Sequence, residues 1–184
     1  MRAYYVDDQH NFVSGTTFEE IINLYYFDGE LKLLLLEVLE KIEINFKTKI
    51  INELCSFYQT AHRFMKPEVF ITPTAYSAIN SMIVDTINKN KDSAFIKHYY
   101  QKYDTPDLPA IRMILQIMPF GAVCMLYNSL GASNKKIIAK KHDIQRKVFS
   151  SRIVCMAYLR NLSAHSDRVR NRTMTKKVNI FGKE

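Results

Sequence analysis

The residues with the clearest chemical potential lie near the carboxyl end of the chain, where Arg160, Asn161 and His165 stand close together. A guanidinium group binds phosphate through paired hydrogen bonds, and an imidazole gains and loses a proton near neutral pH. These two groups supply an anion clamp and a proton shuttle, which are what cleavage of a phosphodiester needs. The pattern therefore indicates phosphodiester chemistry that requires no metal ion and no cofactor.

The spacing of this pair restricts how it can be assembled. On an ideal helix, residues five positions apart point about 140° away from each other. Arg160 and His165 therefore cannot face one pocket from a single straight helix. Either the helix ends between them, or two copies of the chain face each other and form a composite site on a two-fold axis.

Basic residues are concentrated in the same part of the chain. Residues 132–184 contain 14 Lys and Arg against 3 Asp and Glu, whereas residues 1–131 contain 12 against 15. Clustered cations favour a polyanionic partner such as RNA, although a solvated tail is the alternative. The candidate RNA-binding residues are Arg168, Arg170, Arg172, Lys135, Lys136, Lys140 and Lys141.

Other functional classes find little support in the sequence. There is no glycine-rich phosphate loop, nucleophile elbow, CxxC pair or Cys/His cluster, so an NTPase, a serine hydrolase and a structural zinc site are not indicated. No signal peptide is visible at the amino end, and the apolar stretch 113–127 is broken by Gln116, Pro119 and Gly121. We expect a cytoplasmic protein that does not enter a membrane.

The elements that must position the pair are helices. Thr16 and Thr17 stand three residues before Glu19 and Glu20, which predicts a capping box and a first short helix to about Phe27. Asp28 is expected to cap a second, long helix from Glu30 to about Tyr58. The apolar positions of that helix recur at helical spacing, namely Leu31, Leu34, Leu35, Val38, Ile42, Phe46, Ile50 and Leu54. On its polar side, Glu43 and Lys47 form an i,i+4 pair, interpreted as a surface pair or as a carboxylate that orients an active-site cation.

Further helices follow the same pattern. Thr74 is expected to cap a helix that reaches Asn88, and Gly131 to end the helix over 120–130. The remaining helices are predicted over 93–103, 110–118, 134–141 and 144–162. The loop 104–109 is too short for a domain boundary, so we predict one all-α domain over 1–184, with no strands.

A family resemblance adds to this pattern. The run Arg160-Asn161-Leu162-Ser163-Ala164-His165 resembles the R-x4-H motif of HEPN ribonucleases. Along the chain, the resemblance to the bacterial Abi-like abortive-infection family is carried in order by Gly15-Thr16-Thr17-Phe18-Glu19, Leu24-Tyr25, Phe27-Asp28, Leu31, Ile42-Glu43-Ile44, Leu108-Pro109, Phe120-Gly121, Ile138-Ala139, Arg160-Asn161, Ala164-His165, Arg168 and Asn171-Arg172. Relative to that family, Ser166 stands where a second histidine is common, and an upstream helical segment is expected to be missing.

The resemblance implies a HEPN-like helical bundle with additional helices, a homodimer and a metal-independent ribonuclease used in antiphage defence or as a toxin. It implies Arg160 and His165 as the catalytic pair, with Asn161 in support. The substrate would be a transfer or messenger RNA, and an RNA or protein antitoxin could restrain the enzyme. The alternative is a helical module that binds RNA or protein without cleavage.

Overall fold

The computed structural model describes residues 14–56, 60–165 and 168–179. Within these residues the fold is built from helices, and the sole β-type pairing there is an isolated bridge between Phe70 and Leu130. The α-helices are α1 (Phe18–Ser56), α2 (Pro73–Lys89), α3 (Ala94–Lys102), α4 (Ile111–Ile117), α5 (Phe120–Ser129), α6 (Ala132–Lys140) and α7 (Arg146–Ala164). Two short 3-10 helices, η1 (Arg63–Met65) and η2 (Pro67–Val69), join α1 to α2. The predicted all-α class is confirmed.

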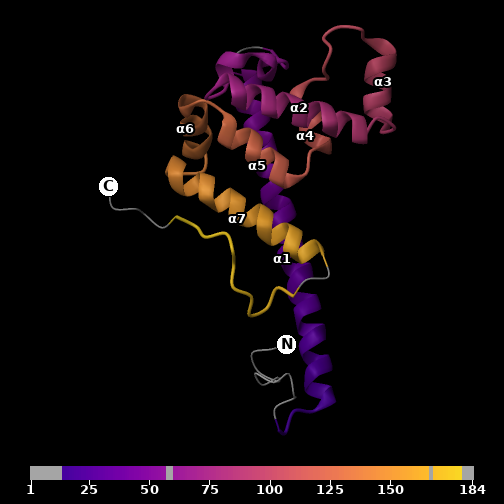
Figure 1. Ribbon diagram of the computed structural model, residues 1–184, viewed down its shortest axis with the longest axis vertical. Coiled ribbons are helices and arrows are strands. Elements are labelled where there is room, and N and C mark those ends of the chain that lie inside the picture. Colours follow the sequence, from indigo (N-terminus) through magenta and orange to yellow (C-terminus); the bar gives the residue numbers. More distant parts are fainter. Residues whose placement is uncertain (1–13, 57–59, 166–167, 180–184) are drawn as a thin grey trace.

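Helix α1 is longer than the sequence predicts. It runs unbroken for 39 residues, or about 58 Å, and Figure 1 shows its amino-terminal part extending beyond the other helices. The capping box forms at Thr17, whose N–H donates to Glu20 Oε2 at 2.9 Å. The expected break at Asp28 is wrong, because that side chain is buried in mid-helix and does not cap a helix. The predicted end near Tyr58 lies outside the described residues.

The core gathers around the carboxyl-terminal half of α1. Phe46 is 1% exposed, and its ring makes edge contacts with the rings of Phe120, Tyr127 and Phe149 at centroid distances of 6.1, 5.5 and 5.6 Å. Helices α4, α5 and α7 pack on this part of α1. Leu34 and Val38, predicted as core residues, are instead 65% and 55% exposed, because they lie on another side of α1 than the buried Asp28 and Leu39.

Two predicted caps are placed differently. Thr72, and not Thr74, caps α2, because Thr72 Oγ1 accepts from the Ala75 N–H at 3.1 Å. Gly131 does not end α5: Leu130 is the C-cap, and Gly131 is the N-cap of α6 with a φ of −56°. A Cβ at Gly131 would approach Val69 O at 3.4 Å, so the glycine permits this close packing against η2.

The apolar stretch 113–127 is divided between two elements. Helix α4 ends at Ile117, and Pro119 is the N-cap of α5. Among the described residues, none of the helices combines the length and apolar character needed to cross a membrane.

The aromatic cluster yields a stability prediction. Phe46→Ala removes a fully buried ring at the centre of three others, so we expect it to lower the free energy of unfolding by about 3–5 kcal/mol in urea denaturation. The control is Met125→Ala, at a 59% exposed position on α5, for which we expect a change below about 0.5 kcal/mol. Similar losses for the two variants would contradict the assignment of Phe46 to the core.

Candidate functional site

Helix α7 carries the predicted pair at its carboxyl end. Arg160 and Asn161 lie in the last turns of the helix, which ends at Ala164, and His165 is the first residue beyond it. The N–H of His165 donates to the Asn161 carbonyl at 3.1 Å, and the backbone of His165 is extended. The helix therefore ends between the two residues, which is one of the two arrangements that their spacing allows.

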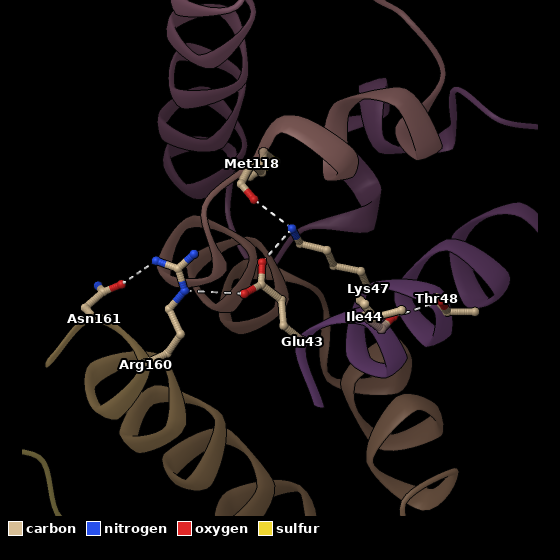
Figure 2. Close-up of polar contacts among 7 residues, drawn as sticks. All are labelled: Glu43, Ile44, Lys47, Thr48, Met118, Arg160 and Asn161. Carbon is tan, nitrogen blue, oxygen red and sulfur yellow. Dashed lines mark hydrogen bonds and ion pairs between the residues drawn. The ribbon is translucent and has the colours of Figure 1, made fainter. Parts of the chain in front are cut away.

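Arg160 lies against α1. Its Nε is 3.8 Å from Glu43 Oε2, and its Nη1 donates to Asn161 Oδ1 at 3.5 Å (Figure 2). The Arg160 side chain remains 41% exposed. A guanidinium has five N–H donors, so the exposed part of this one can donate further hydrogen bonds.

Glu43 links this arginine to the body of the fold. Its Oε1 is 2.7 Å from Lys47 Nζ, and Lys47 donates in turn to the Met118 carbonyl at 2.9 Å (Figure 2). The side chains of Glu43 and Lys47 are only 14% and 16% exposed. The interpretation of this pair as a surface pair is therefore wrong. One carboxylate holds two cations, and one of these cations is fixed to the end of α4.

These residues line a groove on the exposed side of α1. The groove has a volume of about 490 Å³ and is bounded by Leu36, Glu40, Glu43, Ile44, Lys47 and Arg160. His165 is exposed and is not among these lining residues. A single chain thus presents the arginine in a groove, with the histidine just outside it.

The predicted RNA-binding arginines lie on the segment after the motif. Asp28 Oδ1 accepts from the N–H groups of Val169 and Arg170 at 3.2 and 2.8 Å, so this segment lies against α1. Arg168 and Arg170 are half-buried and Arg172 is exposed.

The predicted RNA-binding lysines form a separate group on and after α6. Lys135 donates to the Asn128 carbonyl at 2.9 Å, and Lys141 pairs with Glu53 at 3.1 Å. These two side chains thus join elements of the fold, whereas Lys136 and Lys140 are exposed. Lys141 contacts α1 at Glu53, which lies about 15 Å along the helix axis from Glu43. None of the four lysines is among the residues that line the Arg160 groove.

The thiols are unsuited to act as nucleophiles. Burial, together with the negative charge of Glu43, raises the pKa of Cys124 to about 12. Burial also raises the pKa of Cys55 and Cys155, although nearby Arg112 and Lys176 partly oppose the effect. The thiolate, which is the reactive form, is therefore disfavoured at neutral pH at each of these positions.

His142 serves packing. Its ring stacks on Phe149 at a centroid distance of 4.6 Å, and burial and the nearby Lys49 lower its pKa. A neutral, stacked imidazole of this kind belongs to the core boundary rather than to a proton-transfer site.

Two acidic residues of α1, Glu43 and Asp28, make long-range contacts that the sequence did not predict. Glu43 was visible as the partner of Lys47, but its contact with Arg160 joins residues 117 positions apart, which local spacing cannot reveal. Asp28 was interpreted as a cap, and its contacts reach residues 141 and 142 positions away. An acidic side chain on the same side of α1 as buried apolar residues was the one available signal.

Comparison with known proteins gives one match. The family described as Abi-like protein matches residues 1–171 of the chain. No curated protein and no solved structure matches it.

The Glu43 network yields a second prediction. Glu43→Gln leaves the largely buried ammonium of Lys47 without its counter-charge, so we expect a loss of about 1–3 kcal/mol in the free energy of unfolding. Glu37→Gln is the matched control, because Glu37 forms the same i,i+4 pair with Lys41 at 2.6 Å, but with side chains 64% and 73% exposed. For this control we expect no more than about 0.5 kcal/mol in urea denaturation. Equal losses for the two variants would show that burial of the Glu43–Lys47 pair adds nothing to the free energy of unfolding.

Proposed function

Because the chain belongs to the Abi-like protein family, which indicates an abortive-infection type of protein, we propose that it is a metal-independent endoribonuclease of the HEPN type. Arg160 and His165 are the proposed catalytic pair, and Asn161 is the proposed supporting residue. The observation that carries the proposal is the half-exposed guanidinium of Arg160, held over a groove by a buried carboxylate on another helix.

The proposed reaction uses a hydroxyl of the substrate itself. The ribose 2′-hydroxyl attacks the adjacent phosphorus, and the bond from phosphorus to the 5′-oxygen breaks. His165 moves the proton, and Arg160 stabilises the charge that builds on the phosphoryl oxygens. The products are a 2′,3′-cyclic phosphate and a 5′-hydroxyl end.

Glu43 supports the role of Arg160 as a positioning residue. Its carboxylate contacts the Nε of Arg160, and Nη1 of the same guanidinium contacts Asn161. A guanidinium held by one edge is pre-organised to bind phosphate with the other. The charge of the carboxylate is already shared with Lys47, so it cancels only part of the arginine's charge.

The exposed side of α1 supports pairing of two copies. Tyr26, Leu33 and Ile44 are 64%, 69% and 57% exposed, and their spacings of 7 and 11 residues place them on one side of the helix. Ile44 also lines the Arg160 groove. Monomeric proteins rarely expose large apolar patches, and a second copy on this side would cover the patch and reach the groove. We therefore propose a two-fold dimer in which His165 of one subunit serves Arg160 of the other.

The catalytic assignment predicts the effect of two substitutions. The purified protein should cleave transfer RNA or a structured messenger RNA fragment in the presence of EDTA, because no step needs a metal. Arg160→Ala and His165→Ala should each lower the rate by about 100-fold or more, with unchanged helical circular dichroism. Cleavage that persists in both variants would reject the pair. RNA binding without products in the parent protein would instead indicate the non-catalytic module.

The composite site predicts complementation between the two inactive variants. A heterodimer of Arg160→Ala and His165→Ala subunits keeps one intact pair across the interface, so mixing the two after partial denaturation and refolding should restore cleavage. Leu33→Glu should yield monomers by sedimentation and abolish cleavage, whereas Val84→Glu, on α2 and 38% exposed, should do neither. Inactive mixtures of verified heterodimers would place the pair within one chain.

A further inference from the structure

Asp28 is a buried carboxylate in the middle of a helix. The residue is 8% exposed, and both of its oxygens are engaged. Oδ1 accepts from the N–H groups of Val169 and Arg170, and Oδ2 is 3.2 Å from Lys32 Nζ. Burying such a group is costly unless it is paired and hydrogen-bonded, as it is here. These contacts hold a segment that is 141 residues away in the chain.

The segment that Asp28 holds has no helix or strand of its own. Residues 168–179, here called the basic segment, contain Arg168, Arg170, Arg172, Lys176 and Lys177 and no acidic residue. Its far end is fixed to α7, where the Asn179 N–H donates to Ser151 Oγ at 2.9 Å. Figure 1 shows the basic segment running from α1 back along α7. The basic segment is thus tied to α1 at one end and to α7 at the other.

None of the large apolar side chains of the basic segment is fully buried. The large apolar side chains of the basic segment are Val169 and Met174, which are half-buried, and Val178, which is 39% exposed. Backbone N–H groups outside a helix need a partner when they are buried, and a carboxylate is a strong acceptor for them. The carboxylate therefore fixes the backbone at the beginning of the basic segment to α1.

We propose that Asp28 is a positioning residue that holds the basic segment in place, so that its arginines, the first of which is three positions after His165 in the chain, contact the phosphates of bound RNA. This inference rests on the proposed function for the identity of the ligand, but the attachment itself does not. Asp28 itself touches no substrate.

The ionisation of Asp28 agrees with this role. Burial acts to raise its pKa, but the hydrogen bonds from the Arg170 backbone, Lys32 and the Val169 backbone outweigh burial and lower the pKa below its ordinary value of 3.8. A lowered pKa in the folded state means that the contact stabilises the fold above the ordinary value and is lost as the pH falls through the folded-state value. The carboxylate is thus charged throughout the neutral range.

Limited proteolysis of the full chain tests the attachment, because trypsin cleaves after arginine and lysine. With two charge-assisted hydrogen bonds removed, Asp28→Ala should be cut after Arg168, Arg170 or Arg172 about tenfold faster than the parent. Asp28→Asn keeps an acceptor oxygen for the two N–H groups and should retain most of the protection. Glu30→Ala is the matched control, since it removes an exposed acid two positions along the same helix. Unchanged cleavage in Asp28→Ala overturns the attachment.

RNA binding tests the positioning role separately. The probe is a 2′-O-methyl oligoribonucleotide, which lacks the attacking hydroxyl and stays intact. The slope of log affinity against log salt concentration is negative, and for Asp28→Ala it should become less negative by about one to two because phosphate contacts are lost. Glu30→Ala and Asp28→Asn should keep the parent slope. Faster proteolysis with an unchanged slope overturns the positioning role. If the parent shows no RNA cleavage but Asp28→Ala changes both protection and slope, the proposed ribonuclease function fails and this inference stands.

Discussion

The continuity of α1 past Asp28 is the constraint on which the other features depend. A straight helix fixes the angle and axial distance between its side chains. Asp28 is therefore about 22 Å from Glu43 along the axis, and Glu43 is about 15 Å from Glu53. All three lie within about 80° of one another around the axis. Each of these carboxylates contacts a different part of the carboxyl-terminal third. Asp28 contacts the basic segment, Glu43 contacts Arg160, and Glu53 contacts Lys141. A break at Asp28 would uncouple these contacts.

These contacts show that some of the basic residues near the carboxyl end pair with acidic residues of the same chain. The excess of basic residues after position 131 suggests an external polyanion, yet part of that charge is met inside the chain by the acidic residues of α1. Lys141 donates to the carboxylate of Glu53, and Lys135 donates to the backbone carbonyl of Asn128. The exposed lysines Lys136 and Lys140 are therefore better candidates for phosphate contacts than Lys135 and Lys141.

The helices could be predicted because their apolar residues recur locally, and the capping box of α1 because both of its partners are four residues or fewer apart. The contacts of Asp28 and Glu43 could not be predicted. The neighbouring sequence looks the same whether an acidic residue caps a helix, forms a surface pair or accepts buried hydrogen bonds. Their partners come from α7 and the basic segment, and only tertiary packing brings them together. The exposure of Leu34 likewise depends on which side of α1 the other elements cover. Large apolar residues occur on both the buried and the exposed sides of this helix, so periodicity alone does not identify the buried side.

The position of Arg160 is the reason for proposing that two chains form the site together. Its guanidinium faces a groove whose walls belong to α1, whereas His165 leaves α7 in an extended conformation outside that groove. Proton transfer requires the imidazole within hydrogen-bonding reach of the substrate oxygen that the arginine helps to hold. The apolar side chains beside the groove favour burial by another protein surface, and a second copy would add an imidazole from its own α7. Packing of α1 and assembly of the proposed site would then be one event, because both use the same side of the same helix.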